Sequence, residues 1–459
     1  MKPTALRIGL YGLLVLAALA LRLYHLGELK PPVFDEIFYP KFAYDYIQHK
    51  PFFDAQPPFS KYLLMLGMKA YHALPWVNEP PLGSLPFNEV NAVSYRWVSA
   101  VLGTLLVLVV ARLVFVLTRN HAMALVAGTL VALDGSMIVA SRFGLNNVQI
   151  LFFGFLALMS LASSLTGRFP RGYFLMGCVA LGIVFNIKWN GLAFWLIAIA
   201  GLLAVLLLPL LPKIVTKTNT ADHVLWQACK DLKARQRIGI LSALIAVPAI
   251  VYALLWIPDL RLNQAYGFVD MHKQIYGFHK GSVSAEAHPY CSRWYTWPLM
   301  KRPISYAFET RQVAGEGTYY RDVHSFGNPV LYWLGALAMI ALIGWLGRDI
   351  WRLFLRAETD GHFFFRLSVV GGYLACWLPW MLIKRCTFFY HYQCAAVFSF
   401  IAVAYVLVHL WRLNRWTRYL CLALACMLIA AFVYWLPFQL GIELDQNSWQ
   451  QRMWFRSWI

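Results

Sequence analysis

The sequence predicts an all-α polytopic membrane protein with about eleven membrane-spanning helices. Three observations lead to this fold class. Of the 459 residues, 60% are hydrophobic and only 13% are charged, far fewer than a soluble domain of this length carries. The apolar residues fall into runs of roughly 20, the length of a helix that crosses a bilayer. Blocks of Lys and Arg lie between these runs, as in the cytoplasmic loops of membrane proteins.

The predicted spans follow one another along the whole chain. They cover residues 7–26, 92–117, 122–140, 147–165, 173–187, 191–212, 237–257, 329–347, 364–383, 391–411 and 419–437. The first run is longer than the apolar core of a signal peptide and lacks a cleavage site before its polar flank, so we expect it to remain as a span. The fifth run is short and ends at Lys188, which leaves its division from the sixth open.

The basic loops predict the orientation, because an odd number of spans puts the two termini on opposite sides. With the N-terminus inside, the inner loops collect most of the basic residues. These are Arg168, Arg171, Lys213, Lys217, Lys230, Lys233, Arg235, Arg237, Arg348, Arg352, Arg356, Arg412, Arg415 and Arg418. The net charge of +19 therefore reflects topology and does not indicate nucleic-acid binding.

This topology also predicts how the chain is divided. Residues 1–257 form an N-terminal membrane module that includes a long outer loop, 27–91. Residues 258–328 form a second large outer loop, and 329–459 form a C-terminal block of four helices with an outer tail. We expect short interfacial helices in both loops, and we expect function to concentrate there.

Two adjacent carboxylates, Asp35 and Glu36, follow the first span in an apolar and aromatic setting. Carboxylates in such surroundings are costly unless they are paired or used. Desolvation raises the pKa of a carboxyl group and a nearby cation lowers it, so one of the two could be held as a base. The structural alternative is that Asp35 caps a short helix after Pro31 and Pro32.

Cations also gather at the predicted outer ends of the spans, where the positive-inside rule disfavours them. They are Arg22, Arg96, Arg142, Lys188, Lys384 and Arg385. Cations kept on that side pair with carboxylates or bind an anion, although single ones also extend along the interface. Together with Asp35 and Glu36, the set predicts a pocket for a lipid phosphate beside a carboxylate that activates a hydroxyl.

The outer loops carry further polar and aromatic segments. Residues 52–61 contain Asp54 and two prolines, and residues 288–299 are rich in Trp and Tyr. Such aromatic residues form either an interfacial belt or a stacking surface for sugars. We expect no metal site, because His272, His279 and His288 lack the spacing of helical metal ligands. A disulfide between Cys291 and Cys386 on the outer side is left open.

At these residues the sequence resembles the protein O-mannosyltransferase family, whose members have the GT-C glycosyltransferase fold. The resemblance covers most of the chain and rests on the order and spacing of several short motifs. They are Val33-Phe34-Asp35-Glu36 with Lys41, Phe42 and Tyr46; Phe52-Phe53-Asp54 through Pro57, Pro58 and Lys61; Tyr95 to Ala100; Lys188-Trp189-Asn190-Gly191; His288-Pro289-Tyr290 with Trp297-Pro298-Leu299; and Leu378-Pro379-Trp380 with Arg385 and Phe389 to Tyr392.

The resemblance implies transfer of mannose, with inversion, from polyprenyl-phosphate-mannose to Ser or Thr of exported proteins. By position, Asp35 would be the catalytic base and Glu36 its essential neighbour. The donor phosphate and lipid would be bound by Arg22, Arg96, Arg142, Lys188 and Arg385. Asp54, His288, Tyr290, Trp297 and His391 would lie on the acceptor or sugar side. No cofactor is implied beyond the donor substrate, and the oligomeric state is left open.

The chain also departs from the family pattern. Gln56 stands where the family usually has His, Leu145-Asn146-Asn147 stands where it usually has Asp, and 258–328 is too short for the sugar-binding insert of eukaryotic members. The compact form implies a bacterial enzyme of the cytoplasmic membrane whose site faces outward. The alternative function is transfer of a lipid-linked sugar to a lipid or glycan, as in lipid A aminoarabinose transferases. A transporter is disfavoured, because the charges gather at one interface.

Overall fold

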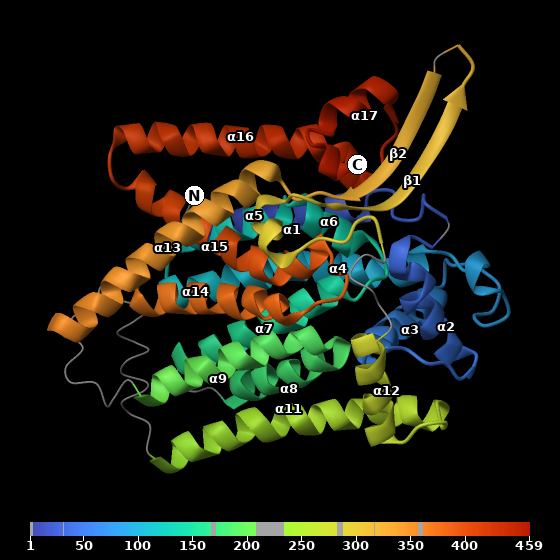
Figure 1. Ribbon diagram of the computed structural model, residues 1–459, viewed down its shortest axis with the longest axis horizontal. Helices are drawn as coiled ribbons and strands as arrows, with labels where there is room; N and C mark the ends of the chain where they lie inside the picture. The colour runs from blue at the N-terminus through green and yellow to red at the C-terminus, as the bar shows by residue number, and fades with distance from the viewer. Residues whose placement is uncertain are drawn as a thin grey trace.

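The structure of the protein, a computed structural model, describes residues 3–30, 32–166, 171–207, 234–281, 288–315, 317–356 and 361–459. Long helices lie side by side and make up most of the molecule (Figure 1). Of the basic residues predicted in the inner loops, Arg168, Lys213, Lys217, Lys230 and Lys233 lie outside the described residues.

Eight segments of the described chain are long and apolar enough to cross a membrane. They contain α1 (Pro3–Leu23), α4 (Val93–Thr118), α7 (Asn147–Thr166), α11 (Ala234–Leu262), α13 (Pro329–Arg356), α14 (Phe363–Trp377), α15 (Gln393–Trp411) and α16 (Arg415–Leu440). The apolar windows of α4, α7 and α15 are 67%, 61% and 61% buried, whereas those of α1 and α11 are each 11% buried. The first three therefore form the centre of the bundle, and the last two leave apolar surface for lipid to cover.

The described residues contain four further apolar helices. α5 (His121–Ala132) and α6 (Gly135–Arg142) form one apolar segment with a bend of 60°. Asp134 stands at the bend and caps α6, because its side chain accepts a hydrogen bond from the backbone of Met137. α8 (Arg171–Ile187) and α9 (Leu192–Leu207) are shorter apolar helices. Every predicted span corresponds to one of these elements, apart from the end of the sixth span, 208–212, which lies outside the described residues. This correspondence confirms a multi-pass helical protein; the exact number of spans stays a prediction.

The first outer loop folds into short helices on the end of the bundle. After the turn η1 (Phe34–Ile37) come α2 (Tyr39–Ile47), with Pro40 in its first turn, and α3 (Phe59–His72), which follows Pro58. Tyr44 and Leu64 are buried in the cluster that joins these helices to α4. This packing fixes the loop that carries Asp35.

The second outer loop contains both helix and strand. α12 (Phe268–Gly281) is followed by the 3-10 turn η5 (Trp294–Leu299) and by two antiparallel strands, β1 (Ile304–Val313) and β2 (Gly317–Ser325). A short strand of the tail, β3 (Leu444–Asp445), pairs with the outer side of β2 and leads into α17 (Gln446–Arg452). The mainly helical class is confirmed, but the expectation of an all-α protein was wrong for this hairpin.

The loops lie together at one end of the molecule. In Figure 1, α2, α3, α12, the hairpin and α17 all gather at the right-hand side of the helical bundle. Segments that are far apart in the sequence therefore meet there, and the side chains predicted to act together are brought to the same end.

Candidate active site

The adjacent carboxylates Asp35 and Glu36 lie in η1, a single turn of 3-10 helix. Successive residues of such a helix project about 120° apart, so the two side chains face different surroundings. Phe34 precedes them with a φ of 53°, a left-handed conformation that costs a residue other than glycine about 1–3 kcal/mol. Its ring stacks on that of Tyr306 with the centroids 4.6 Å apart, and this contact helps to hold the turn.

Glu36 anchors the first loop to the bundle. Its side chain is fully buried, and Arg96 of α4 donates to both of its oxygens, from Nε to Oε1 at 2.9 Å and from Nη2 to Oε2 at 2.6 Å. The backbone N–H groups of Gly144 and Val33 donate to the same two oxygens at 2.7 and 2.8 Å. Because its oxygens accept four hydrogen bonds within the protein, Glu36 has a structural role.

Arg96 has further partners, as do two other arginines predicted to bind the donor. Arg96 also donates to the carbonyl oxygens of Leu26 and Leu29, in the residues that follow α1. Arg22 and Arg142 donate to backbone carbonyls of α1, α5, α16 and the residues after α1. These bonds join α1 to the rest of the bundle and support a positioning role; a direct role in donor binding stays a prediction for all three.

Asp35 points into a different group of side chains and is only half-buried. Burial raises the pKa of its carboxyl group to about 6, Lys188 acts against that rise, and Asp54 adds to it. The phenol groups of Tyr39 and Tyr306 lie close enough to feel the charge of Asp35, and burial raises the pKa of both. A carboxylate with these properties is ionised at neutral pH yet basic enough to accept a proton.

Lys188 stands in a break between two helices. α8 ends at Ile187, and the turn η3 (Trp189–Gly191) leads into α9. Only glycine fits at position 191, because a Cβ there would overlap the backbone of Val184. Burial lowers the pKa of the Lys188 ammonium to about 8, against the opposing effect of Asp35.

The Lys188 ammonium is available to an anion. Its Nζ lies 5.6 Å from the ring centroid of Tyr390. Among the residues that the structure describes, no ion pair holds this group. Arg385 is a second cation near this group, and its charge lowers the pKa of Lys188 further. Burial in turn lowers the pKa of the Arg385 guanidinium. Two cations close together with no carboxylate bound to Lys188 are an arrangement that suits a phosphate.

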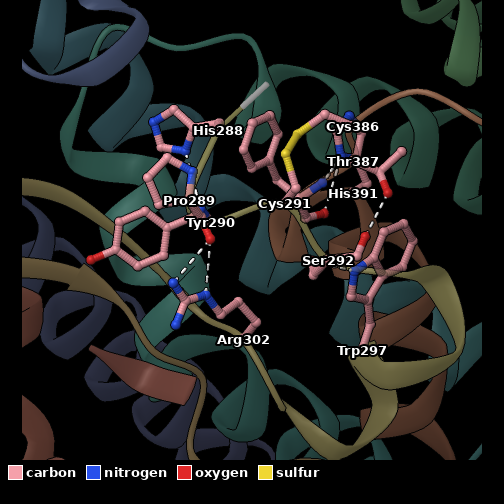
Figure 2. Close-up of a disulfide and its surroundings, with 11 residues drawn as sticks. His288, Pro289, Tyr290, Cys291, Ser292, Trp297, Arg302, Cys386, Thr387 and His391 are labelled. Atoms are coloured by element: carbon pink, nitrogen blue, oxygen red, sulfur yellow. Dashed lines mark hydrogen bonds between the residues drawn. A yellow bond between two sulfur atoms is a disulfide. The ribbon is translucent and has the colours of Figure 1, made fainter. Parts of the chain in front are cut away.

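A disulfide fixes the segment that carries Arg385. Cys291 of the second loop is bonded to Cys386, 95 residues further along the chain (Figure 2). Beside it, the backbone N–H of Ser292 donates to the carbonyl of Thr387 at 2.7 Å, and the Thr387 hydroxyl donates to the carbonyl of Ser292 at 2.7 Å. The disulfide that the sequence left open is thus present, directly after Arg385.

Asp54 joins the site through the loop between α2 and α3. Lys61 donates to its Oδ2 at 2.5 Å and also to the carbonyl oxygens of Gln56 and Pro57. The ring of His279 from α12 is hydrogen-bonded to the carbonyl of Ala55 at 2.9 Å. Burial lowers the pKa of His279, and Arg385 and Lys188 lower it further.

The remaining predicted residues divide between surface and interior. His288 is exposed, and the neighbouring Tyr290 stacks on the guanidinium of Arg302 at 4.9 Å (Figure 2). Trp297 has no exposed surface and donates to Ser292, so the structure places it in the core; a role toward the sugar stays a prediction. His391 is also buried, between the ring of Trp297 and that of Tyr390.

The structure therefore brings together Asp35, Asp54, Lys188 and Arg385 from four separate segments. Sequence reasoning missed Tyr306 and His279 as neighbours of this group. Tyr306 lies in a hairpin that was not predicted, and His279 was considered only as a metal ligand. An amphipathic pattern over 268–281, which places His272 and His279 seven residues apart, was the available signal for the second.

Comparison with protein families gives two matches that follow one another along the chain. Residues 12–260 match the model described as dolichyl-phosphate-mannose-protein mannosyltransferase. Residues 265–458 match the model of the C-terminal four-transmembrane region of protein-O-mannosyltransferase. The two models together cover most of the chain.

Individual relatives extend over almost the same length. The polyprenol-phosphate-mannose–protein mannosyltransferase of Mycobacterium tuberculosis is 26% identical over 97% of this chain and 91% of its own. The enzyme of the same name from Corynebacterium glutamicum is 25% identical, over 93% and 88%.

Solved structures share the fold at lower identity. The S. cerevisiae Pmt1–Pmt2 protein O-mannosyltransferase complex bound to the sugar donor superposes with a TM-score of 0.80 and 15% identity, over 100% of this chain and 93% of that one. The structure of ArnT from Cupriavidus metallidurans has a TM-score of 0.50 and 13% identity, over 96% and 75%.

Proposed function

Because this chain belongs to the dolichyl-phosphate-mannose-protein mannosyltransferase family, we propose that it transfers mannose from polyprenyl-phosphate-mannose to Ser and Thr hydroxyl groups of exported proteins. One observation carries the proposal: Asp35, whose pKa burial raises to about 6, is close enough to Lys188 for each charge to act on the other, and the charge of Arg385 acts on Lys188 as well. Transfer needs a base for the acceptor hydroxyl and positive charge for the departing phosphate, and this group supplies both.

In the proposed reaction the acceptor oxygen forms a bond to C1 of mannose while the bond from C1 to the phosphate oxygen breaks. The proton of the hydroxyl passes to the Asp35 carboxylate. The polyprenyl phosphate leaves with the electron pair of the broken bond, and Lys188 and Arg385 stabilise its added negative charge. Attack opposite the leaving group inverts the anomeric carbon.

The reaction requires no cofactor in this proposal. Polyprenyl phosphate is a good leaving group, and two side-chain cations can offset the negative charge that develops on it. Glu36 and Arg96 act on the reaction through position, because their ion pair fixes the turn from which Asp35 projects.

We place the protein in the bacterial cytoplasmic membrane, with the N-terminus cytoplasmic and the site facing the exterior. The gathering of both long loops at one end of the bundle supports a site on one side of the membrane (Figure 1). The Cys291–Cys386 bond at that end supports an oxidising compartment.

The test uses purified protein in lipid nanodiscs with polyprenyl-phosphate-mannose and a panel of Ser- and Thr-containing peptides, lipid acceptors and glycans. We expect mannose on peptide hydroxyls. Transfer to lipid or glycan alone would replace the proposed acceptor class, and no transfer to any acceptor would remove the proposed function.

A further inference from the structure

One end of β1 lies at the candidate active site. The Tyr306 ring stacks on Phe34, directly before Asp35, and burial together with the charge of Asp35 raises the pKa of the Tyr306 phenol. Tyr306 is the extra residue of a β-bulge, because Ser305 pairs with His324 while Ala307 pairs with Val323. The bulge directs this side chain toward Phe34, and regular pairing resumes at Ala307.

The strand that leaves the site has one open edge. The sheet has the order β1-β2-β3, so in the described part of the chain β1 pairs only with β2. On the far edge, the backbone groups of Phe308–Thr310 have no hydrogen-bond partner among the described residues, whereas the carbonyl of Ala307 accepts from the Ser305 hydroxyl at 3.3 Å. Phe308 is 50% exposed, and Glu309 and Thr310 are exposed as well. In Figure 1, the hairpin extends beyond the helical body.

An uncovered edge presents a row of N–H and C=O groups that accept another strand. Binding of this kind takes its affinity from main-chain hydrogen bonds, so it tolerates many side-chain sequences. A protein acceptor that is extended when it reaches the membrane can supply such a strand. The continuity of β1 with Tyr306 means that a strand laid along this edge runs toward Asp35.

We propose that the acceptor polypeptide binds as an added strand on the free edge of β1, giving the order acceptor-β1-β2-β3. This inference rests on the proposed function, since it concerns the acceptor of that reaction. Backbone pairing along Phe308–Thr310 holds the acceptor, and the Ser or Thr beyond it reaches Asp35 past Tyr306. Recognition thus requires an extended backbone and one hydroxyl.

The test is a backbone N-methyl scan of a single-Thr acceptor peptide with the full chain in nanodiscs. In an added strand, alternate N–H groups face β1, so methylation should raise the peptide KM about threefold to tenfold at every second position. The kcat at saturating peptide and the KM of the donor should stay unchanged. A uniform rise, a rise confined to the residues beside Thr, or a flat profile would overturn the inference.

Two protein variants provide the matched control. Successive residues of a strand direct their N–H groups to opposite edges, so Glu309→Pro and Thr310→Pro should differ. The variant that removes the N–H facing β2 should lower the Tm. The other should keep the Tm and raise the peptide KM without changing the donor KM. An unchanged peptide KM in the stable variant would contradict the inference.

The two proposals fail in different ways. If the unmodified peptide receives no mannose while its donor is bound, the proposed function fails and the inference falls with it. If the peptide is mannosylated but the scan shows no alternation, only the edge-strand inference is lost.

Discussion

Glu36 and Arg96 form a bidentate ion pair in which the two side chains are 0% and 1% exposed. Two contacts of 2.9 and 2.6 Å join a loop residue to a membrane helix 60 positions later in the chain. The pair determines where the neighbouring Asp35 stands, so its removal should affect both stability and catalysis.

Replacing Glu36 by Gln should destabilise the protein by about 3–5 kcal/mol, because it leaves the buried guanidinium of Arg96 without a counter-charge. The measurement is the thermal unfolding midpoint of the variant in nanodiscs. Asp35→Asn, one residue away, serves as the control and should keep the wild-type midpoint. Equal midpoints for Glu36→Gln and the wild type would show that the pair does not stabilise the fold.

Asp35→Asn should lower kcat about 100- to 10,000-fold, the usual contribution of a general base. Donor binding should be largely retained, because Lys188 and Arg385 remain. Single-turnover mannose transfer and binding of a labelled donor give the two quantities separately. Near-normal turnover in this variant would rule Asp35 out as the base.

The pH dependence follows from the raised pKa of Asp35. A base works in its deprotonated form, so kcat should fall about tenfold per pH unit below the pKa of about 6 and level off above it, up to the pH near 8 at which Lys188 loses its proton. Initial rates from pH 4.5 to 7.5 at saturating substrates test this profile. The residual activity of Asp35→Asn should lack the inflection; an inflection retained in that variant would assign it to another group.

Lys188→Met should weaken donor binding about 10- to 100-fold, the value of a charge-assisted hydrogen bond of about 1.5–3 kcal/mol. Because burial lowers the pKa of Lys188 to about 8, affinity for polyprenyl phosphate should also decline in the wild type above that pH. Lys188→Arg should remove the decline, since arginine stays protonated. If Lys188→Met changed only the peptide KM, the phosphate assignment would be wrong.

Opening the disulfide should raise the donor KM and lower stability by about 2–4 kcal/mol. Cys291 and Cys386 are changed together to Ser, because the bond holds the segment next to Arg385. Cys426→Ser, at an exposed free thiol, is the control and should change neither value. An unchanged donor KM in the double variant would mean that the position of Arg385 does not depend on the bond.

The sequence predicted the helical membrane bundle and located the charged residues of the site, because apolar length and isolated charges are local signals. It could not predict which residues meet. Glu36 and Asp35 look equivalent in the chain, and only the long-range contact with Arg96 separates their roles. Trp297 was predicted on the sugar side of the site because the sequence does not reveal its burial. That burial depends on a contact with Trp380, more than 80 positions away.

The hairpin was missed for a related reason. Residues 304–313 alternate poorly between apolar and polar types, so they lack the usual signal of a strand, and the most conspicuous feature of the loop is its aromatic content. Strand pairing is set by contacts between β1 and β2 and by the tail strand β3, which the local sequence does not reveal.

The single 3-10 turn of η1 has a consequence for how the family's sequences can change. Because neighbouring positions in this turn face directions about 120° apart, deleting one residue between Val33 and Asp35 would turn Glu36 toward Lys188, and inserting one would turn both carboxylates away from it. Two acidic residues in a row offer no redundancy here. The length of this short segment should therefore be more strictly conserved than its composition. Related chains that keep both acids but change the number of residues between Val33 and Asp35 should be inactive.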